Sequence, residues 1–327
     1  MENELHAAQT AVREAIGLCR AVQDGIDPGV LEKQDRSPVT IADLGSQALI
    51  CRSLATALPD DPVVGEEDAL TLRQPEQAEF LDRIARQLSA RGVDADPETI
   101  CDWIDRGAAD PCDRFWTLDP IDGTKGFLRG DQYAVALALI VDGQVEVAVL
   151  GCPGLGSTED GGLVFSAIRD SGARVAPASD PADSRPVVAS DCNDVTQARL
   201  CESVESAHSS HDRSKRIAQA LGLETDSVKL DSQAKYATVA DSGAEIYLKL
   251  PVDSDYVEKI WDHAAGSLVV TESGGTVSDT LGQPLDFSCG RTLSKNTGVV
   301  VSNGPLHEQV LKAVIASDTS RDPGHGH

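Results

Sequence analysis

Two carboxylates, a hydroxyl and a constrained backbone occur together in the hexapeptide Asp119-Pro-Ile-Asp-Gly-Thr124. The apolar run 115–118 before it predicts a buried strand that stops at Pro120. Asp119 and Asp122 are then expected at the carboxyl end of that strand. Carboxylates and the Ile121 carbonyl are hard oxygen ligands, which suit Mg²⁺ and an anionic substrate. The hexapeptide therefore predicts a site where a metal neutralises phosphate charge and orients a water.

The same hexapeptide leaves two kinds of phosphate hydrolysis to compare. Phosphatases that form a phospho-aspartate also place an Asp after a strand, in an Asp-x-Asp pattern. Here the second carboxylate, Asp122, follows three residues after the first, and that spacing does not fit. We therefore favour direct attack by a metal-activated water over a covalent intermediate.

Three other acids stand at the ends of predicted elements. Thr40 can cap a helix, which puts Asp43 in the first turn, where the helix dipole stabilises a carboxylate. A short apolar strand precedes Glu66 and Glu67, and adjacent residues of an extended chain point opposite ways, so one of the two faces a site. Asp262 precedes a predicted helix. Because the chain has 53 acids, none of these positions is diagnostic alone.

The elements that must carry these acids form a mixed pattern. A helix is predicted over 3–22, and two apolar runs, 133–141 and 144–150, meet at Asp142-Gly143, a strong hairpin signal. The further predicted helices and the closing strand follow. They are the helices 194–202, 213–221, 262–273 and 304–316 and the strand 299–302.

The length of 327 residues favours two domains. The Gly/Pro-rich segment 151–162 is the expected hinge, so we predict an N-terminal α+β domain over 1–152 with most of the metal ligands. A C-terminal α/β domain over 153–316 would carry Asp262 and further substrate contacts. Residues 317–327 are predicted to be a disordered tail.

Charge and hydropathy limit the partners. A net charge of −25 argues against binding a nucleic-acid polymer, because such a protein needs a basic surface. The first 22 residues lack the pattern of a signal peptide, and no apolar run reaches membrane-spanning length. We expect a cytoplasmic monomer that makes no membrane contact.

Four separated motifs together resemble the inositol monophosphatase superfamily. They are Lys33-x-Asp-x-Ser-Pro-Val-Thr-x-Ala-Asp43, Val63-Val-Gly-Glu-Glu67, the run from Trp116 to Gly130, and Trp261-Asp-His-Ala-Ala-Gly266. The extended form is similar to the 3'(2'),5'-bisphosphate nucleotidases within it. That likeness includes Lys125-Gly-Phe-Leu-Arg-Gly130, His208-Ser-Ser-His-Asp212 and Asp231-Ser-Gln-Ala-Lys-Tyr236.

The resemblance implies a layered αβαβα sandwich of the sugar phosphatase type. It also implies a lithium-sensitive enzyme of sulfur metabolism that uses two or three Mg²⁺ ions. The expected reaction removes the 3'-phosphate of 3'-phosphoadenosine 5'-phosphate, giving AMP and phosphate, and 3'-phosphoadenylyl sulfate is a second candidate substrate. Two alternatives stay open, an inositol mono- or bisphosphate phosphatase and a non-catalytic Mg²⁺-nucleotide sensor.

Matched to the family residue by residue, the motifs imply a role for each site residue. Asp43 and Thr124 would position and deprotonate the attacking water. The implied metal ligands are Glu66, Asp119, the Ile121 carbonyl, Asp122 and Asp262. The implied substrate contacts are Thr124, His208, Ser232, Lys235, Lys249 and Asp262. Lys249 stands where relatives commonly have Arg, and a lysine offers a point charge in place of a bidentate fork.

Overall fold

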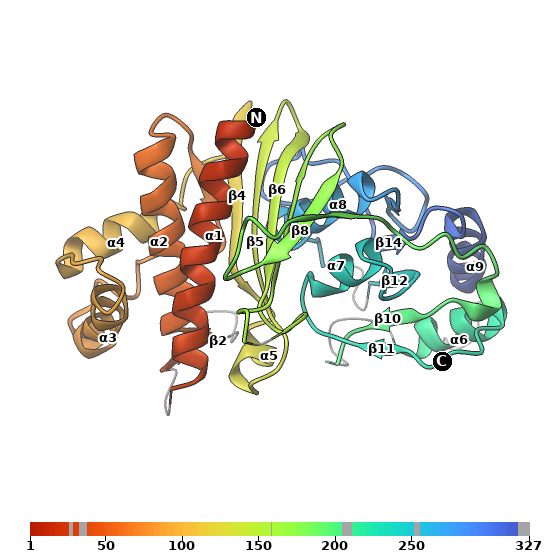
Figure 1. The fold of residues 1–327 in the computed structure, drawn as a ribbon, viewed down its shortest axis with the longest axis horizontal. Helices are drawn as coiled ribbons and strands as arrows, with labels where there is room; N and C mark the ends of the chain where they lie inside the picture. The colour runs from red at the N-terminus through yellow and green to blue at the C-terminus, as the bar shows by residue number, and fades with distance from the viewer. Residues whose placement is uncertain (26–28, 33–37, 158, 205–210, 252–255, 320–327) are drawn as a thin grey trace, which may run out of the picture.

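A computed structural model describes the chain except for residues 26–28, 33–37, 158, 205–210, 252–255 and 320–327. Two β-sheets and three groups of helices alternate in five layers (Figure 1). The predicted αβαβα sandwich is confirmed. In the described part of the chain no helix combines the length and the apolar character needed to cross a membrane.

The first sheet has seven strands in the order β3-β4-β5-β6-β7-β8-β9. β3 and β4 run parallel, and every later pair is antiparallel. Its strands are β3 (Val63–Gly65), β4 (Arg114–Asp122), β5 (Ala134–Val141), β6 (Gln144–Cys152), β7 (Leu163–Ile168), β8 (Ala173–Pro177) and β9 (Arg185–Val187). The parallel pair brings the carboxyl ends of β3 and β4 to one edge, where Gly65 lies opposite Leu118.

The second sheet has five strands in the order β11-β10-β12-β14-β13. Its strands are β10 (Leu200–Glu202), β11 (Val228–Lys229), β12 (Ile246–Lys249), β13 (Thr276–Ser278) and β14 (Val299–Ser302). A separate antiparallel pair joins β1 (Val30–Glu32) to β2 (Pro38–Thr40). β12 ends at Lys249, so this sheet delivers that lysine to its own edge.

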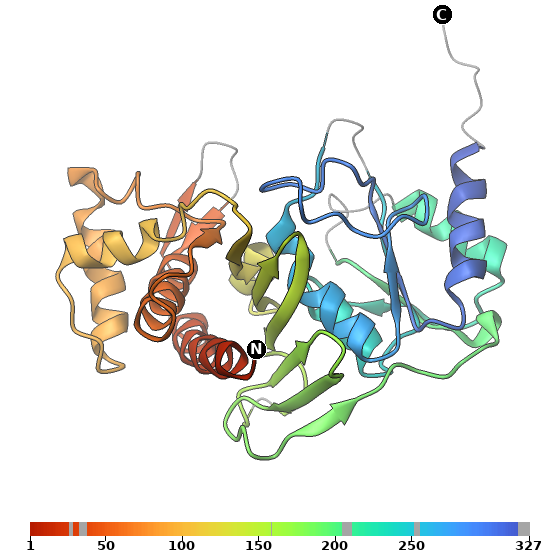
Figure 2. The ribbon, with the colours of Figure 1, turned by 90° about the horizontal axis from the view of Figure 1, so that it is seen from above.

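The helices fill the outer and middle layers. α1 (Glu2–Gln23) and α2 (Ile41–Ala57) cover one face of the seven-stranded sheet, and Figure 2 shows both end-on beside it. α7 (Ala234–Ala240) and α8 (Ala264–Glu272) lie between the two sheets, and α6 (His211–Leu221) and α9 (His307–Thr319) form the far layer (Figure 1). The remaining helices are η1 (Pro75–Gln77), α3 (Ala78–Ser89), α4 (Pro97–Asp105), α5 (Thr124–Leu128), η2 (Val195–Gln197) and η4 (Ile260–Asp262).

Alternation along the strands explains why the layers form. In β5 the larger residues Val135, Leu137 and Leu139 face the cluster around α1 and α2. The alternate positions Ala134, Ala136 and Ala138 face the middle layer that contains α8. Successive side chains of a strand point to opposite faces, so each β5 face contacts a different helical layer. Alanine on the inner face leaves room for α8 to pack close to the sheet.

Three predicted elements were wrong. β4 continues through Pro120 to Asp122, although its register shifts between Asp119 and Asp122. The predicted helix 194–202 is a short 3-10 turn followed by β10. Residues 317–319 continue α9, and the rest of the predicted tail lies outside the described residues.

The predicted domain boundary after residue 152 falls within the seven-stranded sheet, because β7 pairs with β6. The division of the chain into two domains stays a prediction.

Candidate active site

Asp43 is fixed by a capping box at the start of α2. The Thr40 hydroxyl oxygen accepts the amide of Ala42 at 3.1 Å, and Asp43 Oδ2 accepts the Thr40 amide at 2.7 Å and the Thr40 hydroxyl at 2.6 Å. The carboxylate is 1% exposed. Reciprocal bonds of this kind are the normal reason for an acid at the third helical position. Here they also set the direction in which Asp43 Oδ1 points.

Thr124 meets that oxygen from a distant part of the chain. Its hydroxyl lies 3.1 Å from Asp43 Oδ1 and 3.3 Å from the Ile121 carbonyl. Gly123 has φ of 90°, a left-handed conformation that lets β4 pass directly into α5. The structure thus brings the predicted Asp43 and Thr124 together as a hydrogen-bonded pair.

Glu66 and Asp119 come from the parallel strands β3 and β4. The Glu66 amide donates to the Leu118 carbonyl at 3.1 Å, which places Glu66 beside the end of β4. Asp119 is 2% exposed, and its Oδ1 accepts the Ile121 amide at 3.1 Å. Glu66 therefore directly follows the end of β3, and Asp119 lies on the neighbouring strand, three residues before the end of β4.

Asp122 connects the first sheet to the middle layer. Its Oδ2 accepts the backbone amide of Gln233 at 2.6 Å. The Gln233 side chain donates to the Trp261 carbonyl at 2.8 Å and accepts the Gly266 amide at 3.0 Å, so one residue ties Asp122 to the segment that carries Asp262. Burial and then repulsion from Asp262 raise the pKa of Asp122 to about 7, against the opposing effect of two lysines.

The repulsion between the Asp122 and Asp262 carboxylates indicates whether these residues suit a metal ion. Carboxylates that disfavour each other's charge in a buried place are stabilised by a divalent cation, and every predicted donor is an oxygen. The residues present therefore fit Mg²⁺.

A cavity of about 490 Å³ opens beside these acids. Of the predicted site residues, those in its wall are Asp122, Ser232, Lys235, Lys249 and Asp262. Asp43, Glu66, Asp119 and Thr124 are outside this lining as far as the described residues go, although Gly123 and Lys125 on either side of Thr124 belong to it. His208 lies outside the described residues, as do residues 33–37 of the first motif.

Two of the cavity residues have unusual surroundings. Lys235 is 4% exposed, burial lowers its pKa, and its ammonium lies 5.2 Å from the centre of the Tyr247 ring. Ser232 has φ of 67°, which is uncommon for a residue other than glycine. Such backbone strain persists only where the surrounding structure over-determines it, and it often marks a functional site.

Sequence reasoning named Lys249 and Asp262 as site residues but missed Glu258, which contacts Lys249. The Lys249 ammonium lies 2.6 Å from Glu258 Oε2 and 3.4 Å from Asp262 Oδ2. Burial lowers the pKa of Lys249, but Glu258 and Asp262 outweigh it and hold that pKa well above its ordinary value. Burial likewise would raise the pKa of Glu258, but Lys249 and His263 bring it to about 2.

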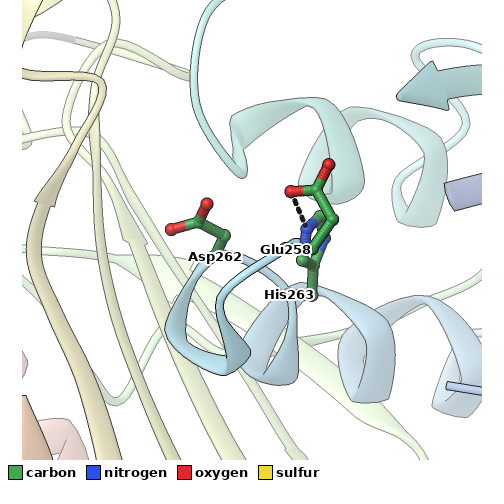
Figure 3. Close-up of side chains that lie close together, drawn as sticks. All are labelled: Glu258, Asp262 and His263. Atoms are coloured by element: carbon green, nitrogen blue, oxygen red, sulfur yellow. Dashed lines mark hydrogen bonds and ion pairs between the residues drawn. The ribbon is translucent and has the colours of Figure 1, made fainter. Parts of the chain in front are cut away.

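His263 completes this group from behind. Glu258, Asp262 and His263 each have a potential ligand atom within 4.8 Å of the others (Figure 3). Both ring nitrogens of His263 have other partners, however, because Nε2 lies 3.0 Å from Glu258 and Nδ1 lies 2.7 Å from the Tyr236 hydroxyl. Tyr236, His263 and Glu258 therefore form a hydrogen-bonded chain that ends at Lys249.

Arg291 is another contact that sequence reasoning missed. Its Nη2 donates to the Gly65 carbonyl at 2.6 Å and its Nη1 to the Ala109 carbonyl at 3.2 Å. The guanidinium carbon also lies 5.1 Å from the centre of the Trp261 ring. Arg291 thus joins the residue before Glu66 to the residue before Asp262. No local motif could have revealed it, because its partners lie far away in the sequence.

Comparison with known proteins shows the family of this chain. The model of the "Inositol monophosphatase family" matches residues 1–319. Curated proteins named 3'(2'),5'-bisphosphate nucleotidase match over nearly the whole chain. The one from Emericella nidulans is 42% identical over 96% of this chain and 97% of its own. The one from Oryza sativa is 44% identical over 95% and 93%, and that from Schizosaccharomyces pombe 41% over 98% and 97%.

Solved structures show the same fold. An inositol monophosphatase from Thermotoga maritima superposes with a TM-score of 0.68, at 20% identity, over 98% of this chain and 99% of its own. One from Anabaena gives 0.62 at 17% identity, over 96% of each. With the family match, these findings show that the chain belongs to the inositol monophosphatase family. It is a phosphatase, that is, a hydrolase of phosphate esters.

Proposed function

We propose that this phosphatase is a 3'(2'),5'-bisphosphate nucleotidase that requires Mg²⁺. It removes the 3'-phosphate of 3'-phosphoadenosine 5'-phosphate to give AMP and phosphate, and it also accepts 3'-phosphoadenylyl sulfate. One observation carries the proposal: a single cavity has the carboxylates Asp122 and Asp262 in its wall together with Lys235 and Lys249. A substrate with two separate anionic groups matches both kinds of residue. The names of the full-length relatives support the same substrate.

The acids at the strand ends are the proposed metal ligands. Glu66, Asp119, the Ile121 carbonyl, Asp122 and Asp262 would hold two or three Mg²⁺ ions. When bound, the metal would neutralise charge on the phosphate oxygens and make a water easier to deprotonate. Without it, the pKa of Asp122 is raised to about 7, which is the behaviour of a ligand set that favours a cation.

Asp43 and Thr124 are the proposed catalytic pair. The Thr124 hydroxyl donates to Asp43 Oδ1, so its oxygen lone pairs are directed away from Asp43. That oxygen can orient the attacking water and accept its proton while Asp43 accepts the hydroxyl proton. Two bonds from Thr40 hold Asp43 Oδ2, so the carboxylate keeps its orientation throughout.

The lysines and Ser232 are the proposed substrate contacts. Burying an ammonium is costly unless an anion or a hydrogen-bond acceptor lies near it. Lys235 is almost fully buried, and its ammonium lies 3.4 Å from the Leu230 carbonyl. A phosphate in the cavity would add a counter-charge to those of Asp122 and Asp231, which act to raise the pKa of Lys235 against its burial. His208, outside the described residues, is a further proposed contact.

A substrate panel tests the proposal. Phosphate release is measured with Mg²⁺ from 3'-phosphoadenosine 5'-phosphate, 3'-phosphoadenylyl sulfate and inositol monophosphate. We expect the adenosine bisphosphate to be turned over with the highest kcat/KM. Turnover of the inositol ester alone would refute the nucleotide assignment and support an inositol phosphatase. Binding of the nucleotide with no turnover of any substrate would instead indicate a sensor.

A further inference from the structure

Two carboxylates compete for one ammonium at the edge of the second sheet. Lys249 Nζ lies 2.6 Å from Glu258 Oε2 but 3.4 Å from Asp262 Oδ2. The first distance is that of a strong charge-assisted hydrogen bond, and the second is longer than such bonds normally are. Glu258 therefore holds the ammonium more closely than Asp262 does.

Glu258 can hold the ammonium because buried side chains fix the position of its carboxylate. His263 Nε2 contacts the same Oε2 atom at 3.0 Å, and the Tyr236 hydroxyl contacts His263 Nδ1 at 2.7 Å. Glu258, His263 and Tyr236 are all buried. A neutral imidazole satisfies both bonds, because the Tyr236 hydroxyl donates to Nδ1 and the Nε2 hydrogen is donated to Glu258. The carboxylate of Glu258 is thereby held in one place.

The Asp262 carboxylate points in a different direction from that of Glu258 (Figure 3). It points away from Glu258 and His263 in Figure 3 and belongs to the cavity wall that also contains Asp122. An ammonium bonded fully to Asp262 would occupy an oxygen that a divalent cation needs. Groups that orient a metal ligand from behind change metal affinity even though they do not touch the metal.

We propose that Glu258 is a positioning residue that holds the Lys249 ammonium away from Asp262 and so leaves the Asp262 carboxylate to a divalent metal. This role rests on the proposed function, in which Asp262 is a metal ligand. It gives the Tyr236-His263-Glu258 chain a purpose at the site, where Glu258 lines the same cavity as Lys249 and Asp262.

Calorimetric titration of the full chain with Mg²⁺ tests this role. Glu258→Gln keeps the size of the side chain but loses its charge, so Lys249 should move onto Asp262 and Mg²⁺ affinity should fall about tenfold. In a Lys249→Met background no ammonium competes, so the same substitution should change the affinity less than about twofold. An equal loss in both backgrounds would overturn the proposal, because Glu258 would then act through its own charge or as a ligand.

Two further variants complete the titration. Tyr236→Phe removes only the hydroxyl that anchors His263, so it should weaken Mg²⁺ binding about twofold with Lys249 present and leave it unchanged in Lys249→Met. This variant keeps the test valid if Glu258→Gln does not fold. Glu308→Gln is the matched control, because Glu308 also has a lysine at 2.6 Å but lies exposed on α9. It should bind Mg²⁺ as the wild type does.

Asp262→Asn separates this role from the proposed function. Wild-type Mg²⁺ affinity in that variant would remove Asp262 from the metal site and overturn the role of Glu258 with it. A weakened Asp262→Asn beside an unaffected Glu258→Gln would overturn the role of Glu258 alone. Neither result depends on which phosphate ester is hydrolysed, because the titration contains no substrate.

Discussion

The Asp43–Thr124 side of the site and the Lys249–Asp262 side are built from contacts of different range. Asp43 is held by Thr40 and Thr124 by the Ile121 carbonyl, each three residues away, although the bond that joins Asp43 to Thr124 spans 81 residues. On the other side, Asp122 depends on Gln233, and Gly65 depends on Arg291. Local contacts form wherever their segment is folded, whereas the distant ones require both sheets to be packed together.

This difference predicts that substitutions on the two sides affect different properties of the protein. Substitutions on the first side should remove catalytic groups with stability changes of the size expected for a helix cap. Substitutions on the second side should weaken metal binding and stability together, because the same contacts serve both. Four experiments, in order of expected effect, test how far the separation extends.

Asp43→Asn should have the largest effect. The amide cannot accept a proton from Thr124, so we expect kcat to fall about 10³-fold at saturating Mg²⁺, with KM changed little. The measurement is steady-state phosphate release. Asp96→Asn is the matched control, because Asp96 is the N-cap of α4 and accepts the Thr99 amide at 2.9 Å, but is not one of the proposed site residues. If both variants lose similar stability and only Asp43→Asn loses activity, Asp43 has a catalytic role beyond its helix cap. Equal activity in the two variants would contradict that role.

Arg291→Met should affect both metal binding and stability. It removes two hydrogen bonds from a charged donor, so the free energy of unfolding should decrease by about 2 kcal/mol. Mg²⁺ affinity should fall about tenfold, because Glu66 and Asp262 lose their common support. Denaturant unfolding and calorimetry measure the two effects. Arg73→Met, which breaks exposed ion pairs to Asp102 and Asp105, should leave Mg²⁺ affinity unchanged. A stability loss in Arg291→Met without a change in Mg²⁺ affinity would contradict the coupling.

The raised pKa of Asp122 predicts that Mg²⁺ affinity changes several-fold with pH. Burial and Asp262 raise its pKa to about 7 in the folded protein, above the value of about 4 in an unfolded chain. Between these values the folded state holds a proton that the unfolded state lacks, so the metal-free protein should lose stability as pH rises to about 7. Mg²⁺ affinity should increase over the same range. Unfolding with chelator at about pH 5.5 and about pH 8 checks this, and Asp122→Asn should flatten the profile. An unchanged slope in that variant would assign the effect to another group.

Thr124→Ser should have the smallest effect. It keeps the hydroxyl but removes the methyl group that restricts the side chain to few rotamers. We expect kcat to fall about threefold, whereas Thr124→Ala should lose about 10²-fold or more. Phosphate release by the two variants measures the contrast. Equal losses would show that the hydroxyl has no part in the reaction.

Much of the first side could be predicted from the sequence because its determinants are local. Thr40 and Asp43 stand at capping-box spacing, and the structure has that box. The predicted turn at Asp142-Gly143 is also confirmed, with φ of 51° and 75° at the two residues, as a two-residue hairpin requires. In both cases the residues that decide the conformation are the residues that adopt it.

The wrong predictions have long-range causes. Leu200–Glu202 forms a strand because it pairs with β12 on one side and β11 on the other, both later in the chain. Such pairing overrides a helical pattern. Pro120 does not end β4, because it falls within the register shift, where its missing amide hydrogen breaks no ladder bond.

Glu258 was missed for a related reason. No motif surrounds it. Its partners are Lys249, at the end of β12, and His263, which lies between η4 and α8 and is anchored in turn by Tyr236 of α7. Its significance is visible only when these elements and η4 are packed together.

Ser232 has a consequence for directed evolution. Its left-handed backbone costs about 1 kcal/mol that glycine would not. A library selected only for survival of heating should therefore accumulate Ser232→Gly, whereas one selected for nucleotide turnover should keep the serine, which lines the cavity. The two selections would diverge at this position, and the divergence would mark where the chain has exchanged robustness for recognition.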